Sequence, residues 1–288
     1  MDMTAETGRY ADWIGRTEDR LDLVAAGPLD RLNATLDRED PPLRPGEAAT
    51  PLSHWCMFLP GEPHSALGPD GHAARGGFLP PVHALPRRMW AGSRLVFHAP
   101  LRVGMAVRRR STIAAVSARE GSLGPLVFVT VRHEIREDTA GGPALLEEEH
   151  DIVYRDARAN AVKPAPEAPP PGPWQRSLVP DPVLLFRYSA LTFNGHRIHY
   201  DRPYVTEEEG YPGLIVHGPL IATLLLDLLR RQRPEARVTH FTFRAVSPIF
   251  DGAPLHLNGA PPDAEGRVPL WATNAGGGLA MRAEARIG

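Results

Sequence analysis

The feature that most limits the fold of this chain is a proline-rich segment over residues 161–173, which reads Ala-Val-Lys-Pro-Ala-Pro-Glu-Ala-Pro-Pro-Pro-Gly-Pro. Proline has a fixed φ angle and no backbone N–H, so we expect this segment to be extended and semi-rigid. The 288 residues are enough for two modest domains. We therefore predict an N-terminal domain over residues 1–160, a linker over 161–173 and a C-terminal domain over 174–288.

Both parts of the chain contain a series of segments with the pattern of β-strands. They are rich in β-branched and aromatic residues, alternate partly between apolar and polar positions, and are separated by turns that contain glycine. Successive strands joined in this way are expected to be antiparallel. The predicted strands lie at 93–100, 105–117, 126–136 and 145–155 before the linker and at 237–246, 254–259, 267–273 and 279–287 after it.

Each strand series is preceded by a helix candidate. The segment 219–231 begins with Pro219 after Gly218 and stops before Pro234, and it is apolar on nearly all sides, so we expect it to be buried. The segment 28–37 is a weaker version, with leucines on one face. A buried helix wrapped by an antiparallel sheet, occurring twice, predicts an α+β fold of the double-hotdog type, although other α+β arrangements would give the same pattern.

Composition narrows the classes of partner. A formal net charge of −2 and a hydrophobic fraction of 42% are typical of a globular protein and give no reason to expect nucleic acid or a membrane surface as partner. No run of eighteen apolar residues occurs, and the first residues lack a basic region followed by an apolar one. We therefore predict a cytoplasmic protein. The single cysteine, Cys56, excludes an intrachain disulfide and is expected in the core.

Chemistry is expected in the segment 188–201, Tyr-Ser-Ala-Leu-Thr-Phe-Asn-Gly-His-Arg-Ile-His-Tyr-Asp. Histidine can both accept and donate a proton near neutral pH, so His196 and His199 on one short turn indicate general acid–base catalysis. A zinc site is the alternative. The two histidines are three positions apart and no cysteine or ligand motif containing glutamate stands nearby, so we predict that no metal is bound.

This segment resembles the signature of the MaoC-like (R)-specific enoyl-thioester hydratases and dehydratases. Their usual run is Tyr-x-x-Leu-Ser/Thr-Gly-Asp-x-Asn-Pro-Ile-His-x-Asp, followed by a His-Gly pair that opens the hotdog helix. The matching residues here are Tyr188, Leu191, Thr192, Ile198, His199, Asp201, His217 and Gly218. The resemblance implies a double hotdog, with two antiparallel sheets that each wrap a central helix, and a hydro-lyase activity.

The departures from that run point to a subfamily. Asn194 occupies the place of the usual catalytic aspartate, and His196 and Arg197 replace the usual Asn-Pro. This variant resembles a group that includes the fungal mitochondrial thioester dehydratase and bacterial hydratases of mesaconyl-, 3-methylfumaryl- and itaconyl-type CoA esters. The bacterial members are also similar in the N-terminal part, around His54-Trp55, Leu67-Gly68-Pro69-Asp70-Gly71-His72, Arg75-Gly76-Gly77-Phe78-Leu79-Pro80-Pro81 and Pro86-Arg87-Arg88-Met89-Trp90-Ala91-Gly92.

The resemblance implies catalytic roles for four residues. His199 is expected to be the principal acid–base group, and the amide of Gly218 is expected to point at the thioester carbonyl, where the helix dipole favours an enolate. Asn194 cannot take a proton but can hold and orient water. The second titrating group would have to be His196 or a group outside this segment, and we expect His196.

Further residues are candidates for substrate binding. Arg197, between the two histidines, is expected to bind a substrate carboxylate, and Arg87 and Arg88 are expected to bind the phosphates of CoA, since guanidinium groups suit both anions. Tyr188 and His217 complete the predicted set. A core position for Tyr188 and a structural role for His217 at the helix start are the alternatives.

We therefore expect a hydro-lyase that acts on a short branched dicarboxylic acyl-CoA, such as mesaconyl-CoA, 3-methylfumaryl-CoA or itaconyl-CoA, with no cofactor beyond the CoA of the substrate. One alternative is an (R)-3-hydroxyacyl-thioester dehydratase of fatty-acid or polyketide synthesis. Another is a hotdog protein that binds acyl thioesters without catalysis. A hydro-lyase for dicarboxylic substrates should have an arginine that faces the acyl group. A dehydratase for plain acyl chains should have an apolar tunnel. Because hotdog sheets often pair, a homodimer is plausible.

Overall fold

The computed structural model describes residue 8 and residues 10–121, 124–156 and 164–288, so residues 161–163 of the predicted linker lie outside the described residues. The longer helices are α2 (Ala26–Thr35), α3 (Pro182–Thr192) and α4 (Gly218–Gln232). The short helical turns are η1 (Ala11–Trp13), η2 (Ser53–Cys56), η3 (His64–Ala66), η4 (Arg197–His199) and η5 (Tyr204–Glu208).

Ten strands form one antiparallel sheet in the order β1-β3-β4-β5-β2-β7-β10-β9-β8-β6. Before the linker lie β1 (Thr17–Leu23), β2 (Arg87–Phe97), β3 (Ala106–Gly121), β4 (Gly124–Glu137) and β5 (Ala144–Arg155). After it lie β6 (Trp174–Leu178), β7 (Val238–Ala245), β8 (Leu255–Gly259), β9 (Arg267–Thr273) and β10 (Leu279–Ile287). The eight strands and two helices expected from the pattern are all present, whereas β1, β6 and α3 were not predicted.

The two strand series meet where β2 pairs with β7, from Gly92 opposite Arg244 to Val96 opposite His240. A side chain at Gly92 would begin 2.3 Å from the carbonyl oxygen of Phe243, so glycine is needed for the two strands to approach. The prediction of two separate sheets is therefore not confirmed, because this pairing makes the sheet continuous. The division into two domains stays a prediction.

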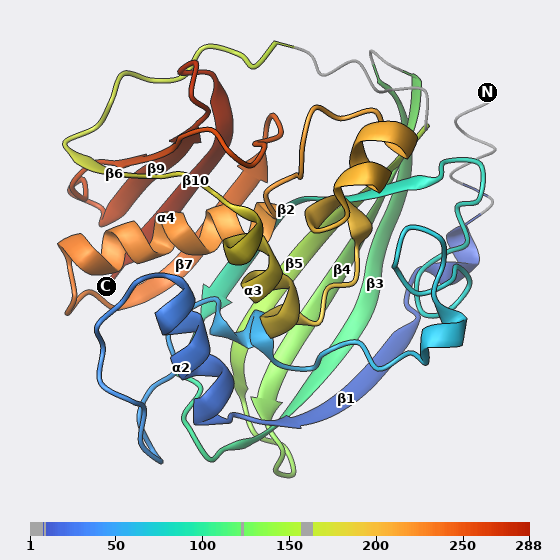
Figure 1. The fold of residues 1–288 in the computed structure, drawn as a ribbon. Helices are drawn as coiled ribbons and strands as arrows, with labels where there is room; N and C mark the ends of the chain where they lie inside the picture. The colour runs from blue at the N-terminus through green and yellow to red at the C-terminus, as the bar shows by residue number, and fades with distance from the viewer. Residues whose placement is uncertain (1–7, 9, 122–123, 157–163) are drawn as a thin grey trace.

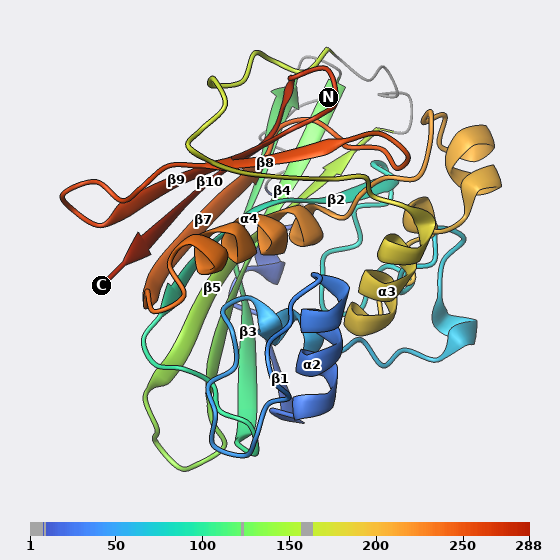
Figure 2. The same cartoon turned by 60° about the vertical axis from the view of Figure 1, so that its left-hand side comes forward.

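Helix α4 lies across the C-terminal strands, and all its residues from Leu220 to Leu229 are buried. They form the centre of the largest apolar cluster, together with residues of β7, β8, β9 and β10. Figure 2 shows that strands at the two ends of the sheet run in clearly different directions, with α4 against the β7–β10 part and α2 in front of β1 and β3. This packing fixes the start of α4, at Gly218, beside the loop that follows α3.

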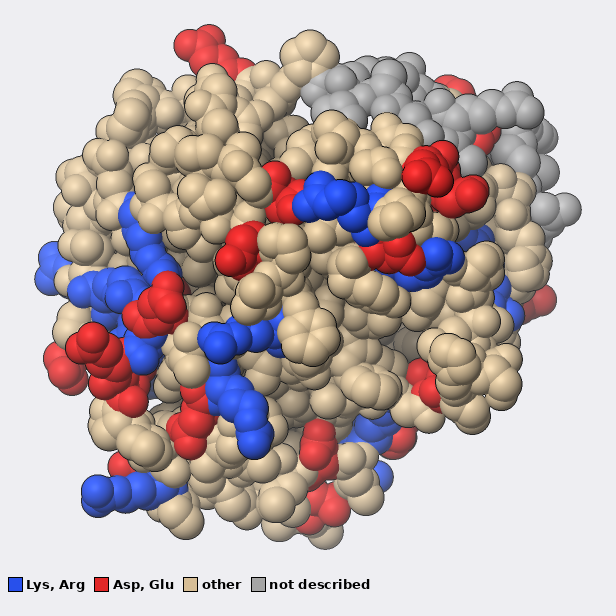
Figure 3. All heavy atoms as spheres, in the orientation of Figure 1, with Lys and Arg blue, Asp and Glu red and all other residues tan. Residues whose placement is uncertain are grey.

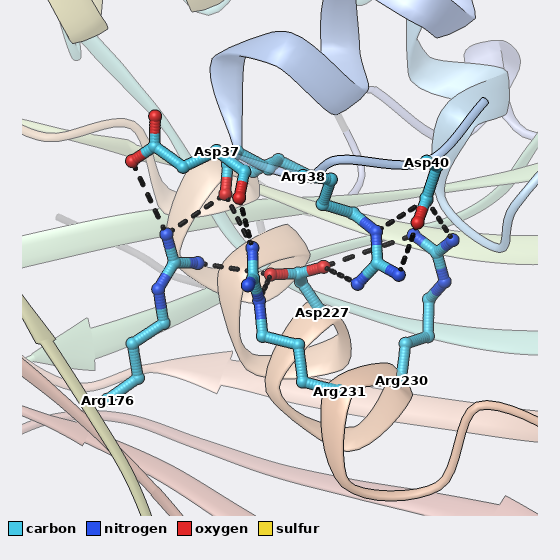
Figure 4. A network of polar contacts seen from close by, with 8 residues as sticks. Asp37, Arg38, Asp40, Arg176, Asp227, Arg230 and Arg231 are labelled. Carbon is cyan, nitrogen blue, oxygen red and sulfur yellow. Dashed lines mark hydrogen bonds and ion pairs between the residues drawn. The ribbon is translucent and has the colours of Figure 1, made fainter. Parts of the chain in front are cut away.

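A buried ion network joins α4 to the N-terminal part of the chain (Figure 4). The carboxylate of Asp227, which is 2% exposed, is contacted at 2.7–4.0 Å by four arginines: Arg38, Arg176, Arg230 and Arg231. Arg176 and Arg231 also donate hydrogen bonds to the carbonyl oxygen of Leu36, just after α2. One carboxylate thus connects α4, β6 and the end of α2.

On the face drawn in Figure 3, basic and acidic side chains are interspersed and form no broad patch of one sign. This distribution fits the near-neutral net charge. Among the helices that the structure describes, none is long and apolar enough to span a bilayer.

Candidate active site

The histidine-bearing loop is shaped by the end of α3. Phe193, in the left-handed conformation with φ 48°, ends the helix, and the side-chain oxygen of Asn194 accepts a hydrogen bond from the amide of His196 at 3.0 Å. The chain then enters the turn η4, which carries His199. Because the oxygen of Asn194 is used within the loop, its NH₂ group is the part that can hold a water or substrate oxygen.

His199 is buried with one ring nitrogen fixed. Its Nδ1 lies 2.7 Å from the carbonyl oxygen of Ile215, which can only accept, so Nδ1 carries the proton and Nε2 is left as an acceptor. Burial lowers the pKa of His199 to about 4, although the hydrogen bond to Ile215 opposes the shift. The imidazole is therefore neutral near pH 7 and can take a proton at Nε2.

Four imidazoles form a row beside the start of α4. The ring of His199 stacks on that of His217 with centroids 3.6 Å apart, and lies 5.5 Å from His196, which in turn lies 4.0 Å from His72. His217 precedes α4, and its Nε2 hydrogen-bonds to the hydroxyl of Ser189 at 2.8 Å. Burial, followed by the nearby His199 and His196, holds the pKa of His217 well below its usual value. The row therefore consists of largely desolvated rings in direct contact.

Tyr188 and Gly218 lie at the His217 end of this row. The ring of Tyr188 is 1% exposed and contacts the His217 ring with centroids 5.1 Å apart. Gly218 is the first residue of α4, and no heavy atom outside its neighbours lies within 4 Å of the place where a side chain would begin. The N-terminus of a fifteen-residue helix is thus open beside His199.

His72 comes from a loop of the N-terminal part that was not predicted to contribute catalytic residues. Its Nδ1 bonds to the carboxylate of Asp70 at 2.9 Å. Two hydrogen bonds from Arg197 fix this loop to the histidine turn. The backbone amide of Arg197 donates to the carbonyl oxygen of Asp70, and the guanidinium of Arg197 donates to the carbonyl oxygen of Pro69, each at 2.9 Å. Sequence proximity gave no sign of this contact, since the two loops are more than a hundred positions apart.

The predicted site residues other than Arg197 line one cavity of about 1780 Å³. They are Arg87, Arg88, Tyr188, Asn194, His196, His199, His217 and Gly218. The cavity continues along one face of β3, β4 and β5, where it is lined by polar residues: Arg109, Ser111, His133, Glu148 and His150. The residues that the sequence predicted around His199 thus share one cavity, except Arg197. The polar residues of the N-terminal strands that line the same cavity were not predicted.

The three predicted substrate arginines have different surroundings. The guanidinium of Arg197 bonds to Asp201 at 2.8 and 2.9 Å and lies over the ring of Tyr204. Arg197 is not among the residues that line the cavity and already has an acidic partner, so this placement does not support its predicted role in binding a substrate carboxylate, which stays a prediction. Arg87 is paired with Glu209 at 3.0 Å, so it joins β2 to the segment after η5.

Arg88, by contrast, has no carboxylate partner among the residues that the structure describes. The positive charge of Arg88 affects the pKa of histidines in two parts of the cavity. Burial lowers the pKa of His196 and that of His72, and the positive charge of Arg88 contributes to both shifts. Burial likewise lowers the pKa of His150 to about 4, and Arg88 is again among the contributing charges. Arg88 therefore lines the cavity near the histidine row and the N-terminal strands, and its side chain also hydrogen-bonds to Tyr154.

The wall that β5 contributes to the cavity holds a buried carboxylate. Glu148 accepts hydrogen bonds from Trp55 at 3.1 Å and Ser93 at 2.7 Å, and its carboxylate lies 3.0 Å from Nε2 of His54. Burial disfavours its charged form, but the hydrogen bond and charge of His54 outweigh burial, so the pKa of Glu148 lies well below its usual value. Glu148 is thus a satisfied anion rather than a free base.

One group of potential metal ligands lies at the row of imidazoles. Donor atoms of Asp70, His72 and His196 lie within 4.8 Å of one another. Asp70 and His72 already satisfy each other through their hydrogen bond, which accounts for their closeness without an ion. The prediction that no metal is bound stays a prediction.

A glycine allows the two loops to meet. Gly71 has φ +85°, and a side chain there would begin 1.9 Å from the carbonyl oxygen of Gly195. We expect Gly71→Ala to push the Asp70–His72 loop away from His196 and to lower kcat/KM by about 10²-fold, since a displacement near 1 Å has such effects. Gly46→Ala is the matched control, because Gly46 also has φ +85° but nothing within 4 Å. Equal activity of the two variants would contradict the expectation.

The chain is similar to known proteins over most of its length. Residues 52–251 match the family model described as hydroxyacyl-thioester dehydratase type 2. A mesaconyl-C(4)-CoA hydratase of Chloroflexus aurantiacus is 45% identical over 278 residues, which cover 96% of this chain and 97% of that protein.

Solved structures agree in fold. One described as a MaoC-like dehydratase superposes with a TM-score of 0.72 at 15% identity and covers 96% of this chain and 98% of its own. A Mycobacterium tuberculosis protein described as a double hotdog fold superposes with a TM-score of 0.52 at 18% identity, with 96% of each chain covered. These structures show the fold alone.

Proposed function

The chain belongs to the hydroxyacyl-thioester dehydratase type 2 family of MaoC-like hotdog proteins and is a hydratase or dehydratase, and we propose that it hydrates a short branched dicarboxylic acyl-CoA of the mesaconyl-C4-CoA type. The observation that carries the substrate class is Arg88, a guanidinium at the cavity wall without a carboxylate partner among the described residues. In mesaconyl-C4-CoA the free carboxylate is attached to the β carbon. A binding group for it must therefore lie close to the reacting atoms.

The proposed chemistry starts at His199. In hydration its Nε2 takes a proton from a water whose oxygen bonds to the β carbon, and the electron pair of the double bond moves to the thioester oxygen. The resulting enolate is stabilised by the amide of Gly218 and the N-terminal end of α4. The NH₂ group of Asn194 orients the water. A proton delivered to the α carbon completes the addition.

The remaining predicted residues have supporting roles in this proposal. His196 lies between the rings of His72 and His199 and can pass a proton between them. His217 and Tyr188 hold the His199 ring from the other side. No cofactor beyond the CoA of the substrate is proposed. A cytoplasmic location and a homodimer are retained as further proposals.

The substrate class is tested by a panel of mesaconyl-C4-CoA, itaconyl-CoA and crotonyl-CoA, with formation of the hydrated acyl-CoA, followed by mass spectrometry, as the signal. We expect a dicarboxylic substrate to be hydrated fastest. Faster turnover of crotonyl-CoA would support the alternative of a dehydratase for plain acyl chains. Binding without hydration of any substrate would favour the non-catalytic alternative.

Arg88→Met is expected to lower kcat/KM for the preferred dicarboxylic substrate by about 10–100-fold, since a hydrogen bond to a charged group contributes about 1.5–3 kcal/mol. Turnover of crotonyl-CoA should change little, because it has no carboxylate to lose. Arg94→Met is the control, since Arg94 lies on the same strand but pairs with Glu149 and Asp151 at the surface. Equal losses on both substrates would rule out carboxylate recognition by Arg88.

A further inference from the structure

We propose that His72, held by Asp70, is the second acid–base group of this site and exchanges a proton with the α carbon of the acyl group, while His199 exchanges one with the oxygen at the β carbon. The inference rests on the proposed hydration reaction and deepens it. Asn194 stands in the place of the usual catalytic aspartate, and its carboxamide cannot be protonated under ordinary conditions. His72 would perform the proton transfer that Asn194 cannot.

The first support is position. His72 and Asp70 line the same cavity as His199. The His72 ring contacts His196, and the positive charge that His72 acquires on protonation is felt at His199, where it adds to the lowering of the pKa by burial. The ring of His196 separates His72 from His199, so an acyl group bound against this row of rings can meet both imidazoles.

The second support is the construction of the loop. Three independent features hold it on the histidine turn: the backbone bond from Arg197 to Asp70, the guanidinium bond from Arg197 to Pro69, and the close approach at Gly71. Asp70 also accepts from the amide of His72 at 3.1 Å, so one carboxylate holds both the backbone and the ring. This anchoring is what a group that must be placed within a fraction of an ångström requires.

The third support is charge. Within the row of four imidazoles, His72 is the ring that hydrogen-bonds to a carboxylate, whereas His199 bonds to a carbonyl and His217 to a hydroxyl. A carboxylate stabilises an imidazolium, and a neutral acceptor does so much less. If the row takes up one proton, Asp70 therefore favours it on His72 rather than on His199, against the positive charges of Arg88 and Arg75. This is the arrangement that hydration needs.

With these two groups, every proton in the hydration reaction has a donor and an acceptor. In hydration an O–H bond of water breaks, its proton goes to Nε2 of His199, and a C–O bond forms at the β carbon. The electron pair of the double bond passes through the enolate to a new C–H bond at the α carbon, whose proton comes from Nε2 of the His72 imidazolium. Transfer of one proton from His199 through His196 to His72 restores both groups. Dehydration follows the same steps in reverse.

The proposal predicts how activity depends on pH. His199 must be unprotonated, and its pKa of about 4, lowered by burial, sets the acidic limb. His72 must be protonated, and burial lowers its pKa from the usual value; Asp70 opposes this shift, whereas the positive charges of Arg88 and Arg75 add to it. Hydration is therefore lost as the pH rises through the pKa of His72. Asp70→Asn removes the opposing charge, so this alkaline limb should move to lower pH.

Exchange of the α proton separates the two groups. A saturated analogue, methylsuccinyl-CoA, has an α C–H bond but no double bond, so its deuterium uptake in D₂O, followed by mass spectrometry, reports proton transfer at the α carbon alone. We expect the wild-type protein and His199→Ala to exchange, whereas His72→Gln should be at least about 10²-fold slower in both exchange and hydration. His240→Gln, an exposed histidine outside the cavity, is the control and should match the wild type.

Several results would overturn the proposal. These are normal exchange in His72→Gln, no exchange in a wild-type protein that hydrates, or an alkaline limb unmoved by Asp70→Asn. Glutamine keeps a donor for Asp70, so a loop that simply collapses would show instead as a raised KM with unchanged kcat. Activity that a chelator removes and Zn²⁺ restores would assign these side chains to a metal. Failure of the wild type to hydrate any substrate of the panel would reject the proposed function, which is a different outcome.

Discussion

His199→Ala is expected to lower kcat for hydration by about 10²–10⁴-fold, which is the contribution typical of a general acid–base group. The reason is geometric: Nδ1 is fixed by the carbonyl of Ile215, so Nε2 is the nitrogen presented to the cavity, and alanine cannot replace it. The assay is initial-rate hydration of the preferred substrate of the panel at saturating concentration.

Two controls separate a loss of catalysis from a general effect of the substitution. His240→Ala removes an exposed imidazole and should leave the rate unchanged. Thermal unfolding of His199→Ala should remain cooperative, because the ring is replaced without leaving a charge unpaired. Near-wild-type hydration by a folded His199→Ala protein would remove His199 from the mechanism and leave the His72–Asp70 pair as the acid–base centre.

Asp227→Ala is expected to have the largest effect on stability, lowering the free energy of unfolding by about 3–5 kcal/mol. The carboxylate of Asp227 is buried among four arginines, and its loss leaves their positive charges close together with little water to screen them (Figure 4). The network also connects α4 to β6 and to the end of α2. The measurement is urea unfolding followed by far-UV circular dichroism.

The matched control is Asp263→Ala. Asp263 also pairs with an arginine four positions along the chain, Arg267, but at the exposed surface, where ion pairs contribute little. We expect no clear change in its unfolding midpoint. If both variants unfold alike, burial of the Asp227 network would not be the source of its stability. A change in the slope with urea, rather than in the midpoint, would instead indicate a less compact state.

The elements that could be predicted are those with a simple apolar period. α4 is apolar on nearly all sides and lies in the core, and β9 and β10 have the predicted bounds. β1 was missed because its pattern is inverted: Leu21 is 59% exposed, whereas Arg20 points inward and pairs with Glu18. This edge strand faces a polar cavity, a condition that periodicity cannot reveal.

Helix α3 was missed although its start signal was present. Asp181 caps the helix by accepting from the amide of Leu184 at 2.8 Å, and Pro182 occupies the first turn. The end of this helix overlaps the start of the functional segment 188–201, whose residue types follow the motif rather than a simple apolar period. The single sheet was beyond prediction for another reason. The pairing of β2 with β7 joins residues about 150 positions apart, and their register is set by shape at Gly92.

The sequence by itself determined the family resemblance, the eight regular strands, the buried helix and the group from Asn194 to Gly218. These depend on local order: a helix start, a turn and a short run of side chains hold their relations whatever the rest of the chain does. The tertiary structure alone decided that Arg197 fastens a loop, that Arg88 faces the cavity, and that Asp70 and His72 stand beside His196. Those relations cross between distant parts of the chain, and only packing of the folded sheet and loops fixes which charges meet.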